Sequence, residues 1–185
     1  MADSDEINEP NWDRNYVAIP DSEGTDIFKG LRCYTDGSKG AQGCGAGTCI
    51  AVGNHILHTR SYGISRHATV FQTEAKAITL ACSNLKLMIN QKPDLLDHGN
   101  KVVILSDSKS VIGALNRIDT TSKALNEAKD ALNSLANAHN VDVEIRWIMA
   151  HRGIIGNEIA DRAAKTGSTL RNRLQVGLSK AAAKQ

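Results

Sequence analysis

Three short runs of sequence decide the fold: RCYTDGS (residues 32–38), GCGAGTCIAV (residues 43–52) and NHILHTRSYG (residues 54–63). Each run is rich in small, β-branched and apolar residues, and glycine breaks the sequence between them at Gly40 and Gly53. Short apolar runs separated by glycine turns are typical of antiparallel strands that follow one another in a sheet. The segment therefore predicts a three-stranded antiparallel meander.

A helix is predicted directly after the meander. Thr69 and Gln72 have the spacing of a capping box, which marks the first turn of a helix, and Pro93 marks its end. The residues that recur at helical spacing between these limits are Val70, Glu74, Ala77, Ile78, Ala81, Leu85 and Met88.

The remaining sequence alternates between strands and helices. We expect strands at residues 101–105 and 141–148, and helices at residues 108–115, 122–138 and 158–165. A meander followed by strands that are connected through helices predicts an α/β fold. The expected sheet is five-stranded and mixed, with three antiparallel strands and then two parallel strands, flanked by helices.

The two ends of the chain differ from its body in charge. Residues 1–30 hold eight acidic residues against Arg14 and Lys29, a net charge of −6, and since the whole chain carries +2 the remainder carries +8. We expect residues 1–30 to be an acidic linker or extended arm, residues 31–168 to be one domain, and residues 169–185 to be a basic tail that is either solvated or in contact with nucleic acid. The residues of the arm that could dock onto the domain are Trp12, Tyr16, Val17 and Ile19.

The composition also bears on the class and location of the protein. The four cysteines lie in apolar stretches without the paired spacing of a zinc site, so we expect buried free thiols. No apolar run approaches the roughly 20 residues of a membrane span, and the N-terminal residues are acidic, unlike a signal peptide. We expect a cytoplasmic or nuclear protein that is not secreted. A basic body suits a protein that binds phosphate groups, although many basic domains bind no nucleic acid.

Four carboxylates fall where the predicted elements turn them inward. Asp36 interrupts a run suited to a central strand, and Asp107 follows a buried strand at its carboxyl end, where ligands of α/β folds gather. Glu74 shares the apolar stripe of its helix, and Asp161 is flanked by alanines in the last helix. Each acid taken alone could be a separate surface charge. Together they predict one cluster, because a buried carboxylate costs free energy unless a partner compensates for it.

Clustered carboxylates without matching cations repel one another and raise each other's pKa. A divalent cation removes this repulsion, and magnesium prefers hard oxygen ligands. Two such ions can activate a water molecule and stabilise the leaving oxygen in phosphodiester hydrolysis. The four acids therefore predict a site for two Mg²⁺ ions, for which Mn²⁺ could substitute.

The most specific stretch is WIMAHRGIIGNEIAD, residues 147–161. It runs from a strand, through a loop with a glycine hinge, into the last helix. His151 lies in that loop, and because imidazole titrates near pH 7 it is a candidate proton shuttle. A single histidine is more often structural or solvated, so this interpretation depends on the carboxylates nearby.

Together, four pieces of sequence resemble the type 1 ribonuclease H family over residues 31–168. They are YTDGS (residues 34–38), TE (residues 73–74), LSDS (residues 105–108) and the stretch 147–161. The resemblance implies the fold predicted above and an endonuclease that hydrolyses the RNA strand of RNA–DNA hybrids, leaving 5′-phosphate and 3′-hydroxyl ends.

The same resemblance implies a role for each acid. It implies that Asp36 bridges both metal ions, that Glu74 and Asp107 complete one metal site and that Asp161 completes the other. His151 matches a loop histidine of the family that assists proton transfer and product release.

Selectivity for a hybrid requires sensing the 2′-hydroxyl groups of one strand and the DNA-like backbone of the other. We expect backbone groups around Gly37, Ser38 and Gln72 to contribute, with Arg146 and Arg152 supplying positive potential.

The chain departs from the family pattern at three places. Residues 115–124 connect two helices directly where many cellular members insert a basic handle. Val70 stands where cellular enzymes usually place an asparagine, which leaves Thr69 as the better candidate for a phosphate pocket. Lys109 stands where a glutamine often reads the minor groove.

Residues 69–74 (TVFQTE) and 151–158 (HRGIIGNE) look like the ribonuclease H domains of non-LTR retrotransposons, in which the domain follows a reverse transcriptase. This likeness implies a retroelement polyprotein with a covalently linked reverse transcriptase. Two alternatives stay open: a nuclease of the same fold with another substrate, such as a resolvase, exonuclease or integrase, and a catalytically inactive binding or tether domain.

Overall fold

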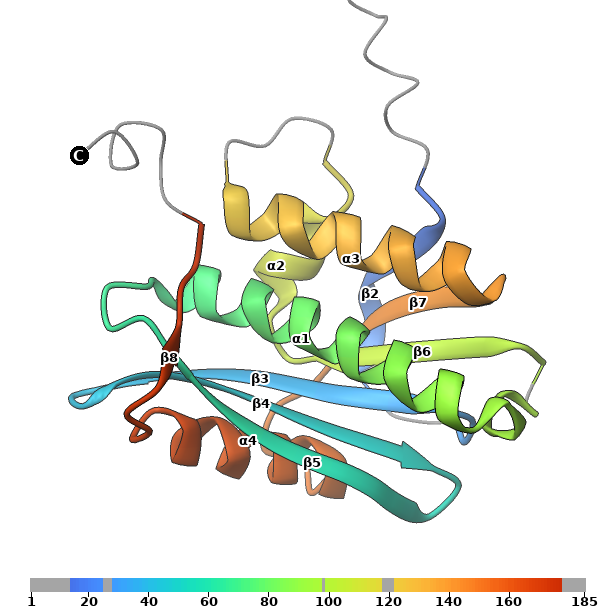
Figure 1. The fold of residues 1–185 in the computed structure, drawn as a ribbon, viewed down its shortest axis with the longest axis horizontal. Helices are drawn as coiled ribbons and strands as arrows, with labels where there is room; N and C mark the ends of the chain where they lie inside the picture. The colour runs from blue at the N-terminus through green and yellow to red at the C-terminus, as the bar shows by residue number, and fades with distance from the viewer. Residues whose placement is uncertain (1–13, 25–27, 98, 118–121, 178–185) are drawn as a thin grey trace, which may run out of the picture.

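The chain folds around one seven-stranded sheet with helices on both faces, as a computed structural model shows (Figure 1). The structure describes residues 14–24, 28–97, 99–117 and 122–177. The strand order across the sheet is β2-β7-β6-β3-β4-β5-β8.

The elements have the following bounds. The strands are β2 (Tyr16–Gly24), β3 (Arg32–Gly40), β4 (Gly43–Val52), β5 (His55–Ile64), β6 (Lys101–Ser106), β7 (Asp142–Ile148) and β8 (Arg173–Leu174). The helices are α1 (Val70–Gln91), α2 (Lys109–Ala114), α3 (Lys123–His139) and α4 (Ile155–Gly167), with a 3₁₀ turn, η2 (Pro93–Leu96), after α1.

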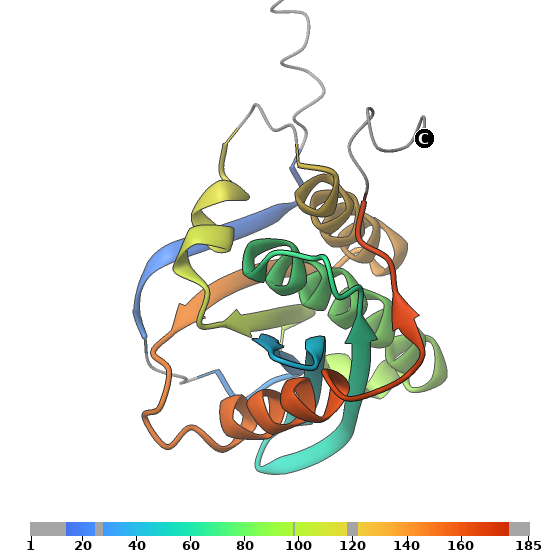
Figure 2. The same ribbon diagram turned by 90° about the vertical axis from the view of Figure 1, so that its left-hand side faces the viewer.

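The predicted α/β fold class is confirmed, and the sheet is larger than expected. Strands β3, β4 and β5 form the antiparallel meander, and β6 and β7 continue the sheet in parallel from β3. The predicted number of five strands is wrong, because β2 pairs in parallel with β7 at one edge and β8 pairs with β5 at the other (Figure 2). The sequence of β2 begins with four apolar residues in a row and β8 has only two residues, so neither strand shows an alternating sequence pattern, and their pairing follows from tertiary contacts.

The helices divide unequally between the two faces of the sheet. Helices α1, α2 and α3 cover one face and α4 covers part of the other (Figures 1 and 2). The larger apolar cluster lies between the sheet and the first group of helices, with Ile104, Ile78 and Leu132 all fully buried. A smaller cluster around Tyr34 and Leu105 lies beneath α4. The buried stripe of α1 predicted from its periodicity is therefore the contact surface of that helix.

The N-terminus of α1 has the predicted capping box. The Thr69 hydroxyl oxygen accepts a hydrogen bond from the Gln72 backbone N–H at 3.0 Å, and the Thr69 N–H donates to Gln72 Oε1 at 2.9 Å. These bonds satisfy two of the free backbone donors in the first turn and fix the start of the helix that carries Glu74.

Helix α4 begins at Ile155, three residues before the predicted start at Glu158. The early start depends on Gly156, since a Cβ there would lie 2.1 Å from Cε1 of Tyr34. The Tyr34 ring thus occupies the space that a side chain at residue 156 would need. Gly156, which in the sequence suggests a loop, therefore lies within the helix and packs against that ring.

Helix α4 also packs closely against β4. A Cβ on Gly47 would lie 2.2 Å from the carbonyl oxygen of Ala160, and one on Gly45 would lie 2.2 Å from that of Ala164. Glycines on the strand and alanines on the helix therefore bring the two backbones together, which carries Asp161 to the end of the sheet.

The C-terminal segment is tied to the body through Arg173. Its guanidinium donates hydrogen bonds to the carbonyl oxygens of Cys44 and Ile64 at 2.9 Å, of Ser168 at 2.7 Å and of Gln42 at 3.2 Å. Part of the predicted tail thus joins the β3–β4 turn, the end of β5 and the end of α4.

The four cysteines are buried free thiols, as predicted. No helix within the described residues has the length and apolarity needed to span a membrane.

Substituting Gly47→Ala should push α4 away from β4, because the added methyl group would overlap the Ala160 carbonyl. We expect the free energy of unfolding to fall by about 3 kcal/mol, measured by urea denaturation. Gly40→Ala is the matched control, since nothing lies within 4 Å of a Cβ at that position. Equal effects of the two substitutions would contradict the close packing described above.

Candidate active site

Two carboxylates leave the sheet side by side because their strands are parallel neighbours. Thr35 of β3 pairs with Ser106 of β6, so Asp36 and Asp107 come next in register on adjacent strands. The Ser108 N–H donates to Ser106 Oγ at 3.0 Å and turns the chain at the end of β6. The prediction that both acids emerge together is therefore matched by the strand register.

The third carboxylate comes from the first turns of α1. The helix passes so close to β3 that a Cβ on Gly37 would lie 3.0 Å from the Glu74 backbone nitrogen. This approach lets the Gly37 N–H donate a hydrogen bond to the Glu74 carboxylate. Asp36, Glu74 and Asp107 each offer an oxygen, and these oxygens lie within 4.8 Å of one another.

Asp161 reaches the same group from α4 on the other face of the sheet. Its carboxyl group shares a hydrogen bond with Asp36, and its Oδ2 lies 3.0 Å from Nζ of Lys165, one helical turn later. Sequence reasoning missed Lys165, although the four-residue spacing between an acid and a lysine on a helix is the signal of such a pair.

Burial raises the pKa of three of these acids. Asp36 and Glu74 are 5% and 8% exposed, and burial together with the charges of neighbouring carboxylates raises their pKa to about 9 and about 8. The pKa of Asp107 is also raised, first by burial and then by the charge of Asp161. Burial opposes ionisation of Asp161 as well, but its hydrogen bond with Asp36 and the Lys165 ammonium lower its pKa.

This set of side chains fits a divalent metal ion. Oε1 of Glu74 is buried and has no hydrogen-bond partner among the described residues. Carboxylate oxygens are hard ligands, and a divalent cation would compensate the burial and the repulsion that raise the pKa values, as well as the unpartnered oxygen. Asp36, Glu74 and Asp107 are therefore the residues that could hold it.

Of the two loop residues singled out from the sequence, His151 lies near these acids. His151 is exposed with a left-handed backbone (φ of 58°), and its charge is among the causes that lower the pKa of Asp107 and Asp161. Arg152 is exposed and its Nε donates to Met149 Sδ at 2.7 Å.

Most of the other candidates for substrate contact have partners within the protein. Thr69 and Gln72 bond to each other at the start of α1, and Ser38 lies at the half-buried end of β3. The Lys109 ammonium lies 4.2 Å from the centre of the Trp147 ring. Arg146, expected to supply positive potential, is paired with Glu144 at 2.9 Å.

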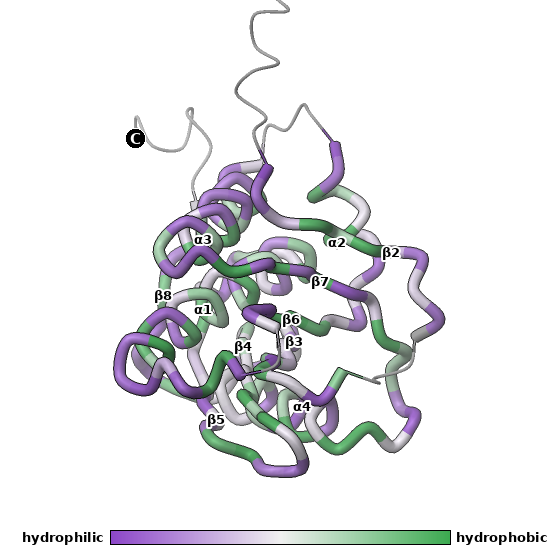
Figure 3. The backbone as a smooth tube through the Cα atoms, turned by 90° about the vertical axis from the view of Figure 1, so that its right-hand side faces the viewer, coloured by the Kyte–Doolittle hydropathy of each residue, from purple (hydrophilic) through white to green (hydrophobic). Residues whose placement is uncertain are grey.

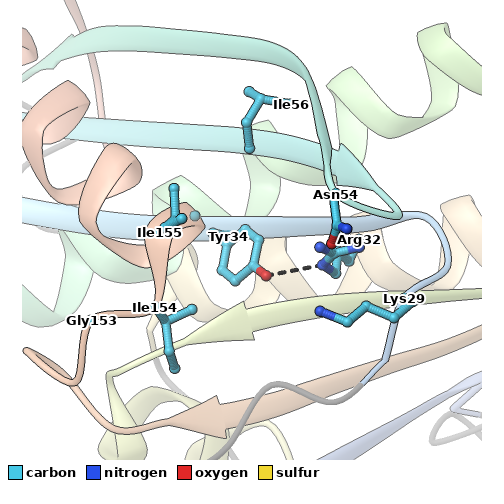
Figure 4. A pocket seen from close by; sticks show the side chains of 9 residues that line it. Lys29, Arg32, Tyr34, Asn54, Ile56, Gly153, Ile154 and Ile155 are labelled. Carbon is cyan, nitrogen blue, oxygen red and sulfur yellow. Dashed lines mark hydrogen bonds between the residues drawn. The ribbon is translucent and has the colours of Figure 1, made fainter.

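A separate pocket of about 370 Å³ lies beside the start of α4 (Figure 4). The Arg32 guanidinium donates from Nε to the Tyr34 hydroxyl at 2.9 Å within it, and Lys29 and Asn54 add polar groups. Its described lining residues include no carboxylate, so this pocket is distinct from the acidic group.

Solved ribonuclease H structures have this fold. RNase H1 from the halophilic archaeon Halobacterium salinarum NRC-1 has a TM-score of 0.52 at 21% identity, covering 74% of this chain and 96% of that one. The N-terminal RNase H domain of rv2228c from Mycobacterium tuberculosis, solved as a fusion with maltose binding protein, has a TM-score of 0.58 at 18% identity, covering 75% and 98%. LC11-RNase H1, isolated from compost by a metagenomic approach, has a TM-score of 0.57 at 17% identity, covering 75% and 98%.

At the level of sequence, the RNase H family model matches residues 29–169, so the chain belongs to the ribonuclease H family. It is accordingly a ribonuclease, a hydrolase. A comparison with curated protein sequences found no significant match.

The raised pKa values make the stability of the metal-free protein depend on pH. Asp36 and Glu74 ionise near pH 4 when unfolded and near pH 8 to 9 when folded. Between these values the folded state holds protons that the unfolded state has lost, so stability should fall as pH rises from about 4 to about 9. Urea unfolding of chelator-treated protein across this range measures the effect, and a stability that stays flat or rises with pH would contradict the clustering.

Asp36→Asn should weaken this pH dependence and raise the free energy of unfolding of the metal-free protein at pH 9 by about 2 kcal/mol, because it removes one charge from the group. Asp142→Asn is the control, since Asp142 is exposed at the start of β7. Adding Mg²⁺ should stabilise the unsubstituted protein more than the Asp36→Asn variant.

Proposed function

We propose that this ribonuclease hydrolyses the RNA strand of RNA–DNA hybrids with two divalent metal ions and leaves 5′-phosphate and 3′-hydroxyl ends. The observation that carries the proposal is the meeting of Asp36, Glu74 and Asp107 oxygens within 4.8 Å, with Asp161 bonded to Asp36, in a chain of the ribonuclease H family. Magnesium is the proposed ion, with manganese as a substitute, because all the ligands are carboxylate oxygens.

Each acid has a proposed place in the site. Asp36 is central, since it contacts the Glu74 and Asp107 side and also Asp161, and we assign it to both ions. Glu74 and Asp107 complete one metal site and Asp161 the other. Bound ions would supply a nucleophile from water and stabilise the leaving oxygen.

His151 is the proposed proton carrier. Its exposed imidazole lies on a loop close enough to Asp107 and Asp161 to affect their pKa. An exposed imidazole can deliver a proton to the leaving group and then exchange it with solvent.

Hybrid binding is assigned to residues around the acidic edge. An A-form or mixed duplex is read through its minor groove, 2′-hydroxyls and phosphates, so backbone amides, hydroxyls and cations are suitable groups. The residues proposed to contact the hybrid are Gly37, Ser38, Thr69, Gln72, Lys109 and Arg152.

The domain limits and the origin of the chain are also proposals. We assign residues 31–168 to the ribonuclease H domain, residues 1–30 to an acidic linker or extended arm, of which β2 pairs with the edge of the sheet, and residues 169–185 to a basic tail, of which β8 pairs with the other edge. The likeness of residues 69–74 and 151–158 to retrotransposon domains supports an origin in a retroelement polyprotein, with a linked reverse transcriptase. A transcript with a reverse transcriptase frame in phase upstream of Met1 would support this origin, and a stop codon directly upstream would exclude it.

Asp107→Asn should abolish metal-dependent cleavage of a labelled RNA–DNA hybrid, with a loss of at least about 1,000-fold, because one ligand charge is lost. The readout is gel mapping of the RNA ends with Mg²⁺ or with chelator, beside duplex DNA and duplex RNA. The Asp142→Asn variant should cleave normally, because Asp142 is exposed at the start of β7, at the opposite end of the sheet from Asp107. Retained cleavage by Asp107→Asn, or equal cleavage of all three duplexes, would overturn the proposal.

His151→Ala should lower kcat for the hybrid about 100-fold and leave KM nearly unchanged, since proton transfer is removed and binding is not. Single-turnover cleavage across pH 6 to 9 measures it. Adding free imidazole should recover part of the lost rate. A variant with unchanged kcat would remove His151 from the mechanism.

A further inference from the structure

Strand β2 precedes the segment matched by the family model, which begins at residue 29, yet it lies beside the elements that frame Asp107. It runs parallel to β7 along the outer edge of the sheet (Figure 3). The register from Tyr16 to Ile19 is regular, and an irregularity then separates Ile19 from Gly24. An irregularity of this kind at a sheet edge re-aims side chains toward the neighbouring strand.

Within this irregular part, a serine reaches β7. The Ser22 hydroxyl donates a hydrogen bond to the backbone carbonyl of Trp147. Pro20, two residues earlier, has no backbone N–H with which to continue a regular ladder. The N-terminal strand therefore holds β7 at Trp147, whose side chain contacts the backbone of Asp107.

The Trp147 side chain contacts two residues that follow β6, Asp107 and Lys109. Its indole Nε1–H donates to the backbone carbonyl of Asp107 at 3.2 Å. Its ring lies 4.2 Å from the Lys109 ammonium, in a cation–π contact. This hydrogen bond restrains the backbone of Asp107, from which its carboxylate projects.

Strand β2, together with Arg14 just before it, also binds the C-terminal end of α2, the helix that begins two residues after Asp107. The Arg14 guanidinium and the Tyr16 hydroxyl donate to the Leu115 carbonyl at 3.1 Å and 2.9 Å. The Asn116 amide in turn donates to the Ala18 carbonyl at 3.2 Å. The segment from Asp107 to Asn116 is thus held by β2 at its end and, through Trp147, at its beginning.

We propose that β2 and Trp147 are positioning elements of the active site, which set the Asp107 carboxylate for metal binding and hold Lys109 beside it. This inference rests on the proposed function, in which Asp107 is a metal ligand. Residues outside the family-matched segment thereby act on the reaction without touching the substrate. Outer-shell partners of metal ligands typically change metal affinity by about 10- to 100-fold when they are removed.

The indole N–H of Trp147 gives a direct readout in the full-length chain. A ¹⁵N-labelled sample has two indole resonances, from Trp12 and Trp147, and the Trp147→Phe variant assigns them. We expect the Trp147 resonance to move in a saturable way as Mg²⁺ is added, because its acceptor belongs to a metal ligand. Trp147→Phe keeps an aromatic ring beneath Lys109 and removes the donor, and it should weaken Mg²⁺ binding about tenfold, followed through backbone amide shifts.

Removing the Ser22 hydroxyl tests the effect of β2 on Trp147 separately from the indole itself. Ser22→Ala should shift the Trp147 indole resonance before any metal is added and weaken Mg²⁺ binding about threefold. Ser22→Thr keeps the hydroxyl and should restore both. Ser83→Ala is the matched control, since its hydroxyl also donates to a backbone carbonyl, that of Thr79, on the exposed side of α1.

Two results would overturn the proposal, and they are distinguishable. If Mg²⁺ shifts the amides around Asp107 while the Trp147 indole and the Ser22→Ala variant show no change in shift or metal affinity, β2 is only an edge strand and the metal site stands. If Mg²⁺ shifts no resonance and hybrid cleavage is metal-independent, the proposed function fails, and the positioning role fails with it.

Discussion

The burial of carboxylates that also repel one another at one end of the sheet is the constraint on which the rest of the structure depends. Asp36 and Glu74 are almost fully buried, and their raised pKa values show how unfavourable their charges are when no cation is present. Folding tolerates the group because apolar packing elsewhere is extensive and because protons or cations can neutralise it. A cation bound by these carboxylates would remove that cost.

The scaffold around this group is built by close backbone approach. Gly47 admits α4 to the sheet, and Gly37 admits the start of α1 to β3. The two helices arrive on opposite faces and deliver Asp161 and Glu74 to the same strand end (Figure 2). Large side chains at either glycine would separate the helix from the strand, so the small residues decide the distances between the acids.

Segments at both edges of the sheet make hydrogen bonds that hold the elements of the core in place. On one side Arg173 joins the β3–β4 turn to the end of α4 through hydrogen bonds to four carbonyl oxygens. On the other side β2 reaches Trp147 and the end of α2. The family match at residues 29–169 describes the catalytic core, and its neighbours in sequence support that core from both edges.

The sequence by itself determined the central elements and the four acids. The glycine-separated runs, the capping box at Thr69 and the helical periodicity of α1 are local patterns, and local patterns can be read from order alone. Only the tertiary structure decided the two edge strands, the early start of α4 at Ile155, where Gly156 meets the Tyr34 ring, and the contact of Trp147 with Asp107. Those features depend on which backbone segment or ring, distant in sequence, lies next to a given residue. Residue spacing along the chain does not predict such contacts.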